Sequence, residues 1–372
     1  MTFRSTPMPS PKKTKHLRAA TLADVGRAAG VSAMAASAVL NSARTSSRIS
    51  AETRERIVKA ATKLHYRPNA AARALANRRM NTLGVVNVIG PDGISYYFME
   101  LLNGILKAAV LHEQNMTVFT LHDWSKDTIR LHGFCDGRID GLILVAPILE
   151  PDAALLPTHT PFVSIHANSA MANVVNVESD EEQGAWEMVR HMVALGHRRI
   201  MHITGPARML GPDRRIQGYR RALASSRIPF DPQLLVPGLY TCDSGREAMR
   251  TWLKKNTGKL LPHAVFCAND DMAVGCMEAL SEVGLRVPDD ISVAGFDDTL
   301  AARTTVPQLA TVRQPLPAMG AQAVDLLLAR IARQNGSGAA ISDKTVVFPT
   351  ELVPRASVGP RLPVERLVAS RP

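Results

Sequence analysis

The segment "TLADVGRAAGVSAMAASAVLN" (residues 21–41) predicts two short helices joined by a tight turn. Thr21 and Asp24 form a Thr-x-x-Asp capping pattern at the start of the first helix. The apolar residues that follow recur at helical spacing: Leu22, Val25, Ala28 and Ala29. Gly30 is expected to end this helix and Ser32 to cap the next one.

The second helix is expected to carry its reading surface on the face opposite its packing residues. Its inward residues are Ala36, Val39 and Leu40, with Val31 at the corner. A third helix is expected from Ser50, with a buried stripe of Ile57, Ala60, Ala61 and Leu64. Helices that cross through a short turn need small side chains at the crossing, and the second helix of such a unit can enter the major groove of DNA. The residues that would meet base edges are Ala33, Met34, Ser37 and Ala38.

The net charge is concentrated at one end of the chain. Residues 1–80 hold 16 of the 44 Lys and Arg residues and three of the 33 acids, so this segment carries +13 and the rest carries −2. Such a local positive field is typical of a polyphosphate partner, because Lys and Arg near phosphates release condensed counterions. The alternatives are a solvated basic surface and a tail attracted to a membrane.

Composition excludes several other classes of protein. A chain of 372 residues with 46% hydrophobic residues is a globular protein of two or three domains. No apolar run is long enough to span a membrane or to form a signal peptide, so a cytoplasmic protein is expected. The four cysteines are scattered without a C-x-x-C pair or nearby histidines, which predicts no disulfide frame, no metal site and no cofactor held by one.

Three segments resemble the DNA-binding part of the LacI family of bacterial transcriptional regulators: "TLADVGRAAGVS", "VLN" and "RISAETRERIVKAATKLHYRPNAAARALANRR". The resemblance implies a sequence-specific regulator, most often a repressor, and two groups of DNA-binding residues. One group would contact phosphates or position helices: Thr21, Leu22, Ser32, Ser37, Asn41, Ser50 and Thr53. The other would read bases: Ala33, Met34 and Ala38.

The chain departs from this family in two places. Many members carry Thr-Val-Ser-Arg where this chain has Ala35-Ala36-Ser37-Ala38, so an arginine able to contact guanine is absent. The following loop, "NSARTSSRIS", is longer than usual and adds Arg44 and Arg48, which we expect to compensate through phosphate or groove contacts. The competing interpretation is that the domain has lost DNA binding.

The segment "YRPNAAARALANRR" is a candidate hinge. Pro68 ends the preceding helix, Asn69 can cap a new one, and residues 70–77 favour helix but are too few to hold one alone. By resemblance the segment is a hinge helix that orders on operator DNA and inserts Leu75 into the minor groove. A simple interdomain linker is the alternative.

From residue 81 onward, apolar strands alternate with amphipathic helices, which predicts parallel sheets covered by helices. Strands are expected at "TLGVVNVIG", "MTVFTLH", "DGLILVA", "PFVSIHA", "RIMHITG", "HAVFCAND" and "DISVAGFDD", and helices near 97–112, 180–195, 212–225, 244–255, 270–283 and 317–333. This is too much chain for one sheet, and the pattern divides near residue 175. By resemblance the whole is a helix-turn-helix domain joined to a periplasmic-binding-protein-like α/β core of two doubly wound lobes.

The core carries no nucleotide-binding, metalloprotease or nucleophile-elbow motif, so an enzyme is not expected. Polar residues follow three strands, where open α/β sheets bind ligands: His166, Asn269 and Asp297. The resemblance implies that Asp297, Asn269 and Arg215 bind effector hydroxyls. It also implies aromatic surface for a sugar face from Phe98, Tyr240 and either Trp124 or Tyr96. Helix caps, an ion pair and core packing are the ordinary alternatives for these residues.

The expected organisation is therefore a disordered tail (1–19), a helix-turn-helix domain (20–67), a hinge (68–80), a two-lobed effector-binding and dimerisation domain (81–357) and a second tail (358–372). The expected partners are double-stranded pseudopalindromic operator DNA, a small-molecule effector and a second copy of the chain. The tail lacks heptads, so a tetramerising coiled coil is not expected. A solute-binding protein and a sugar-acting α/β enzyme are the alternatives, and the sequence identifies neither the effector nor the operator.

Overall fold

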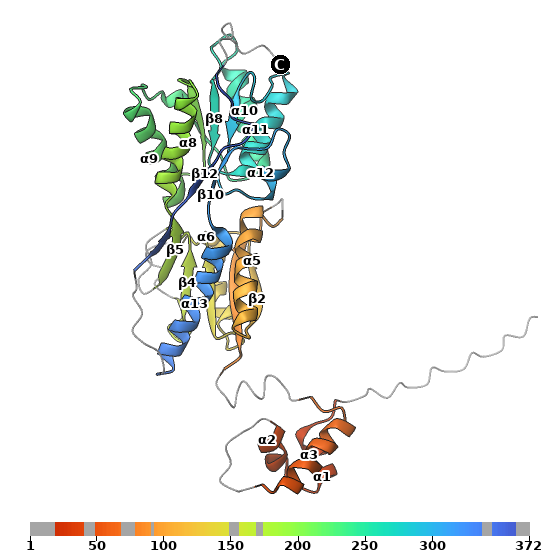
Figure 1. Cartoon of the computed structure of the whole chain (residues 1–372). Helices are drawn as coiled ribbons and strands as arrows, with labels where there is room; N and C mark the ends of the chain where they lie inside the picture. The colour runs from red at the N-terminus through yellow and green to blue at the C-terminus, as the bar shows by residue number, and fades with distance from the viewer. Residues whose placement is uncertain are drawn as a thin grey trace, which may run out of the picture. The chain divides into compact units, whose positions relative to one another are not determined.

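The computed structural model describes residues 19–40, 49–67, 79–90, 93–148, 156–168, 174–336 and 344–361. The chain forms two compact units, Met1–Met80 and Asn81–Pro372, which Figure 1 shows in one view. The expectations for tail residues 1–18 and 362–372, for the loop residues 41–48 and for the hinge residues 68–78 lie outside the described residues. Val358, the first residue of the predicted second tail, is instead buried in the core of the second lobe.

The first unit is a three-helix cluster of α1 (Leu22–Ala29), α2 (Ala33–Leu40) and α3 (Ala51–Lys63). The predicted capping box of Thr21 and Asp24 is confirmed, and Gly30 ends α1 in the left-handed conformation with φ 70°. Gly26 is the residue that lets α1 approach the turn, because a Cβ there would lie 2.7 Å from the carbonyl oxygen of Val31. The core of the unit is small and apolar, consisting of Val25, Ala29, Ala36, Val39, Ile57, Ala60 and Ala61.

Three side chains of this unit differ from the sequence-based expectation. Ala28 is exposed at the edge of its helical stripe. Leu64 is exposed after the end of α3, where it is the C-cap residue. Ala38 is only 7% exposed, although we expected it on the reading face of α2. A single methyl group is covered by few neighbouring atoms, so helical position alone does not fix the exposure of an alanine.

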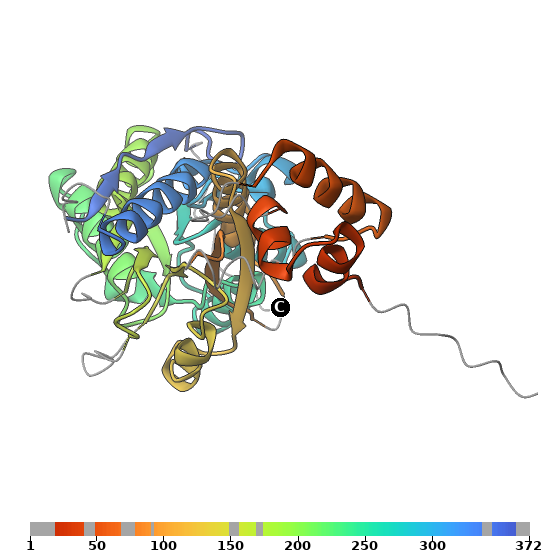
Figure 2. The same cartoon turned by 90° about the horizontal axis from the view of Figure 1, so that it is seen from below.

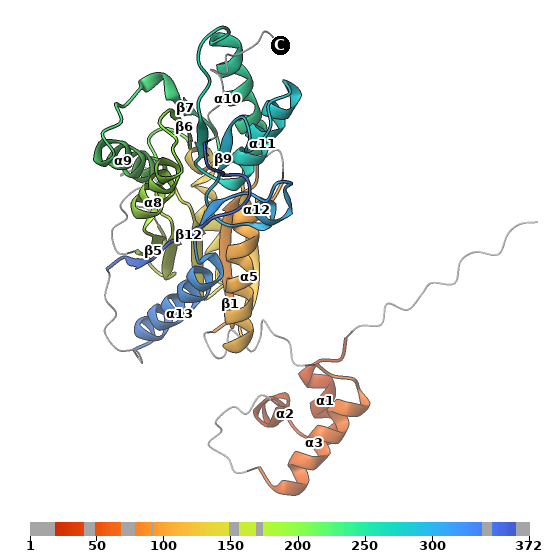
Figure 3. The ribbon, with the colours of Figure 1, turned by 45° about the horizontal axis from the view of Figure 1, so that its top comes forward.

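The second unit contains two lobes. The first lobe is a six-stranded parallel sheet in the order β11-β5-β4-β3-β1-β2. Its strands are β1 (Thr82–Val88), β2 (Asn115–Leu121), β3 (Gly141–Val145), β4 (Phe162–Ile165), β5 (Val175–Ser179) and β11 (Val346–Phe348). Helices α5 (Tyr96–Leu111) and α13 (Leu316–Gln334) pack side by side on one face (Figures 1 and 3). The short helices α6 (Trp124–Asp127) and α7 (Arg130–Phe134) cover the other face, as the view from below in Figure 2 shows.

The second lobe is a four-stranded parallel sheet in the order β7-β6-β8-β9. Its strands are β6 (Ile200–Thr204), β7 (Leu235–Pro237), β8 (Ala264–Cys267) and β9 (Ser292–Ala294), with a 3₁₀ turn, Pro232–Leu234, before β7. Helices α8 (Glu181–Ala194) and α9 (Leu210–Ser225) cover one face, and α10 (Cys242–Lys255) and α11 (Asp270–Glu282) cover the other. Each sheet is therefore buried on both faces, which is why its strands read as continuous apolar runs.

The chain crosses between the lobes more than once. It leaves the first lobe after β5 and returns to it with α13 and β11. The antiparallel pair β10 (Thr311–Arg313) and β12 (Glu351–Val353) and the short helix α12 (Leu300–Thr304) complete the structure.

The predicted helices and seven strands are confirmed, whereas β5, β7, β10, β11 and β12 were missed. The division near residue 175 was placed too early, because Val175 pairs with Val163 inside the first sheet.

Candidate functional site

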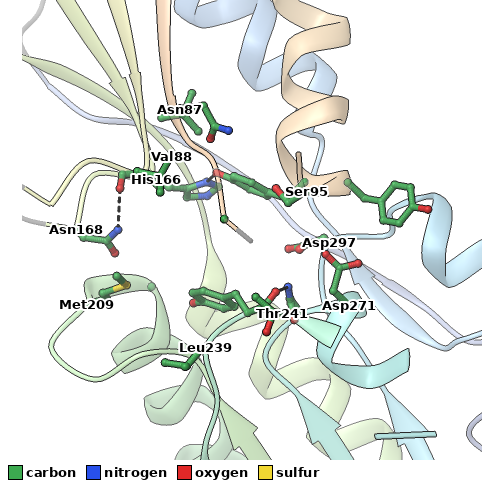
Figure 4. Close-up of a pocket in the computed structure, with 18 of the residues that line it drawn as sticks. Asn87, Val88, Ser95, His166, Asn168, Met209, Leu239, Thr241, Asp271 and Asp297 are labelled. Carbon is green, nitrogen blue, oxygen red and sulfur yellow. Dashed lines mark hydrogen bonds between the residues drawn. The ribbon is translucent and has the colours of Figure 1, made fainter. Parts of the chain in front are cut away.

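A cavity of about 690 Å³ lies between the lobes at the carboxyl ends of their strands. Ligands bind at this edge in open α/β sheets. Figure 4 shows His166 and Asn168 on one side and Met209, Leu239 and Thr241 on the other. Six of the seven predicted effector-binding residues line the cavity: Trp124, His166, Arg215, Tyr240, Asn269 and Asp297.

Phe98 is the exception. It is 1% exposed and packs in the core of the first lobe rather than lining the cavity. The preceding residues on α5, Tyr96 and Tyr97, line the cavity in its place. Helical periodicity could have revealed this difference, because Phe98 shares the i, i+3, i+7 stripe of Leu101 and Ile105.

The first-lobe wall is built around His166, which follows β4. Its Nδ1 lies 2.6 Å from the Tyr97 hydroxyl, and the two rings are tilted at a centroid distance of 5.8 Å. Burial lowers the pKa of His166 to about 4, so the imidazole is neutral at physiological pH. Trp124 begins α6 and presents an apolar surface to the same space.

The second-lobe wall is built around Arg215 on α9. Its guanidinium donates to Glu181 Oε1 at 2.8 Å and to the carbonyl oxygen of Ala268. It also lies over the Phe296 ring at 4.2 Å and near the Tyr240 ring at 5.6 Å. These contacts hold a positive charge in a buried position without leaving it unpaired.

Asn269 and Asp297 occupy the ends of neighbouring strands. Asn269 caps α11 by accepting from the Met272 amide at 3.0 Å, and it donates to the Tyr240 carbonyl at 2.9 Å. It therefore has the ordinary role of a helix cap and also lines the cavity. Asp297 accepts from Gln314 Nε2 at 2.6 Å. Burial raises the pKa of Asp297 well above its usual value, and Arg215 opposes the rise.

Backbone strain gathers around the cavity. Ala146, His166, Tyr240 and Asp297 all line it, and their φ angles are 47°, 48°, 64° and 112°. Residues other than glycine rarely adopt these angles, and such positions cluster at functional sites.

Every guanidinium among the described lining residues is paired with carboxylates. Arg214 lies 3.0 Å from Glu178 and 3.6 Å from Glu181, and Arg215 also pairs with Glu181. Arg246 pairs with Asp243 and Glu278. Sequence reasoning missed Tyr97, Glu181, Arg214, Arg246 and Asp271 as lining residues, because nothing local to them marks the cavity.

In the three-helix unit, several of the predicted DNA-binding residues are exposed or are helix caps. Met34 is 79% exposed on α2, Ala33 beside it is exposed, and Ser37 is half-buried. Ser32 caps α2 by accepting from the Ala35 amide at 3.1 Å, and Ser50 caps α3 by accepting from the Thr53 amide at 3.2 Å.

The other predicted DNA-binding residues divide into two groups. Leu22 is half-buried at the start of α1, and Ala38 is buried. Asn41, Arg44, Arg48, Asn69 and Leu75 lie outside the described residues.

Comparison with known proteins identifies both units. Residues 21–69 match the model of bacterial regulatory proteins of the lacI family, and residues 189–358 match the periplasmic binding protein-like domain. The transcriptional regulator DegA of Bacillus subtilis is 31% identical over 346 residues, which cover 91% of this chain and 98% of DegA. The chain belongs to the LacI family. It is a DNA-binding transcriptional regulator and not an enzyme.

Two solved structures of transcriptional regulators match the chain over nearly its whole length. The Lac repressor dimer bound to operator and the anti-inducer ONPF has a TM-score of 0.76 at 28% identity, covering 92% of this chain and 100% of that one. The complex of the regulator CelR with cellobiose has a TM-score of 0.67 at 28% identity, covering 91% and 99%. Within the described residues, no helix is long and apolar enough to cross a membrane.

Proposed function

We propose that this LacI-family regulator is a homodimeric repressor that binds a pseudopalindromic operator and is controlled by an uncharged polyhydroxylated effector, such as a sugar. Operator binding by the similar Lac repressor dimer supports the DNA-binding part of the proposal. The exposed Met34 and Ala33 on α2 supply its reading surface. Binding to chromosomal DNA would place the protein in the cytoplasm, at the nucleoid.

The composition of the cavity supports an uncharged polyol. Asp297 and Asn269, with a carboxyl and an amide group, line the space together with the aromatic residues Trp124 and Tyr240. Such a set can pair with sugar hydroxyls and cover an apolar sugar face. Because the lining guanidiniums already pair with carboxylates, an anionic ligand would have to displace those pairs. CelR, a similar structure, binds cellobiose.

The observation that carries the proposal is that both lobes line one cavity. An effector that contacts both walls binds the closed and open arrangements unequally, and only this difference can shift the equilibrium between them. The hinge residues 68–78 would pass the change to the DNA-binding helices.

The experiment begins with in vitro selection of bound sequences from random duplex DNA, followed by the salt dependence of the winning sequence. We expect an enriched palindrome with a steep salt slope. Absence of enrichment, with only weak salt-sensitive binding, would show that the missing arginine at position 38 has removed specificity.

Fluorescence anisotropy on the selected operator then tests a panel of neutral sugars and their phosphates. We expect a neutral sugar to change operator affinity while its phosphate does not. Asp297→Asn should weaken this response about tenfold or more while operator binding without effector stays unchanged. A response to the phosphate alone would contradict the uncharged effector.

A further inference from the structure

A chain of hydrogen bonds connects the two walls of the cavity behind the lining residues. Tyr97 Oη lies 2.6 Å from His166 Nδ1, and His166 Nε2 accepts from the Ser179 backbone N–H at 3.2 Å. The Ser179 hydroxyl donates to Gln314 Oε1, and Gln314 Nε2 donates to Asp297 Oδ1 at 2.6 Å. Tyr97, His166 and Ser179 belong to the first lobe, Asp297 to the second, and Gln314 to the crossover between β10 and α13.

The direction of the two hydrogen bonds of His166 follows from the Ser179 backbone N–H. A backbone N–H can only donate, so His166 Nε2 must carry a lone pair. The imidazole is neutral, because burial lowers its pKa to about 4. Its single hydrogen is therefore on Nδ1, where it donates to Tyr97 Oη.

The Tyr97 hydroxyl is consequently left with its own hydrogen to donate. Burial raises the pKa of Tyr97 well above its usual value, so the phenol keeps this hydrogen. Among the described residues, Tyr97 Oη makes no second hydrogen bond, and its side chain lines the cavity. At the other end of the chain, Gln314 occupies only Oδ1 of Asp297, which leaves Oδ2 for a ligand hydroxyl.

We propose that Tyr97 and Asp297 form a polarised pair that sets which atoms the effector must present. Tyr97 donates to an acceptor oxygen on the first-lobe side of the effector, and Asp297 Oδ2 binds a hydroxyl on the second-lobe side. His166, Ser179 and Gln314 are positioning residues that fix this polarity across the lobes. The identity of the ligand rests on the proposed function, whereas the direction of the hydrogen bonds does not.

The direction is tested on the full-length protein labelled with ¹⁵N-histidine and free of effector. Long-range ¹H–¹⁵N correlation spectra report which imidazole nitrogen carries the hydrogen, and the resonances lost in His166→Asn identify His166. We expect a neutral Nδ1–H form, the less common one for an exposed histidine. A neutral Nε2–H form or a doubly protonated ring near pH 7 would overturn the proposal.

The ligand contact is tested with the neutral sugar that changes operator affinity in the panel. Tyr97→Phe should weaken binding of that sugar about tenfold by calorimetry, since it removes one buried hydrogen bond. The matched control is Tyr219→Phe, which removes a buried hydrogen bond to the Ile200 carbonyl oxygen outside the cavity and should change affinity less than about twofold.

These experiments distinguish failure of the polarity proposal from failure of the proposed function. Equal affinity of wild type and Tyr97→Phe would overturn the donor role of Tyr97. If no panel sugar affects operator binding, the proposed function fails, and the tautomer of His166 still decides whether the polarity exists.

Discussion

His202 lies fully buried on β6 and makes the second lobe sensitive to acid. Its ring stacks on Phe266 at a centroid distance of 4.7 Å, and Nδ1 lies 2.8 Å from the Phe266 carbonyl oxygen. Burial lowers the pKa of His202 to about 4, whereas an unfolded histidine titrates near 6.5. The unfolded chain therefore binds the proton first, and the stability contributed by neutral His202 is lost as pH falls from about 6.5 toward 4.

We predict that His202→Asn reduces the loss of unfolding free energy on acidification. Asparagine keeps a donor near the Nδ1 position but does not titrate. Between pH 7 and pH 5 the histidine contributes a loss of about 2 kcal/mol, which the variant should lack. Urea denaturation at both pH values measures the unfolding free energy of each protein. His166 is present in both proteins, so its titration does not contribute to the difference between them. Identical pH dependence in the two proteins would contradict the prediction.

At the scale of single residues, the sequence predicted which types of side chain line the cavity better than it predicted their orientation. Asp297 and Asn269 were predictable because they follow apolar strands, whose carboxyl ends meet at one edge. Tyr97 was not predictable in the same way. It is next to Phe98 on α5, but Tyr97 lines the cavity whereas Phe98 packs in the core. The positive φ angles of His166 and Tyr240 come from tertiary contacts, and no local pattern marks them.

At the scale of an element, the surface of α2 that would read bases consists mostly of small side chains. Met34 is the one large apolar side chain that α2 exposes, and Ala38 is buried. We predict that Met34→Ala weakens binding to the selected operator by about 1 kcal/mol per half-site, as for one lost base contact, and relaxes selection at one base pair. Binding to unrelated DNA should not change, because the free energy of nonspecific binding comes from contacts with phosphates. Competition assays at fixed salt measure both affinities, and a parallel loss on unrelated DNA would exclude base reading.

Helix α5 exposes an apolar stripe on the side away from its core. Met99, Leu106 and Val110 lie on one face and are 45%, 42% and 75% exposed. We predict that this face belongs to the dimer interface, since exposed apolar patches mark such sites. Leu106→Asp should convert the dimer to a monomer in sedimentation equilibrium and weaken operator binding.

The matched control for this face is Ile129→Asp, which changes a 75% exposed residue in the turn between α6 and α7. It should leave the dimer intact. A monomer from both variants would indicate general destabilisation rather than an interface on α5.

Elements with long apolar runs or clear helical periodicity were predictable, and short edge strands were not. Strand β3 is buried along its whole length and follows the pattern of a central parallel strand. Strands β7, β10 and β12 have three residues each and take their form from pairing with distant segments. Three residues carry no period, so their pairing depends on the assembled lobes.

At the scale of the molecule, the order of strands depends on crossovers that sequence does not show. Helix α13 and strand β11 come last in the chain but belong to the first lobe. Gln314 at one crossover contacts both Ser179 and Asp297, and Arg303 of α12 lies 3.6 Å from Glu100 of α5. Relative movement of the lobes would therefore strain more than one of the contacts between them.

The two compact units predict a clean separation of activities. A fragment beginning at Asn81 keeps every described residue of the cavity and the whole α5 stripe. We expect it to bind the effector sugar within about twofold of the full-length affinity, to remain dimeric and to lose operator binding, because the reading helix α2 is absent. Calorimetry, sedimentation and anisotropy measure the three properties. Loss of effector binding in the folded fragment would show that the DNA-binding unit helps to form the effector site, and retained operator binding would remove α2 as the reading element.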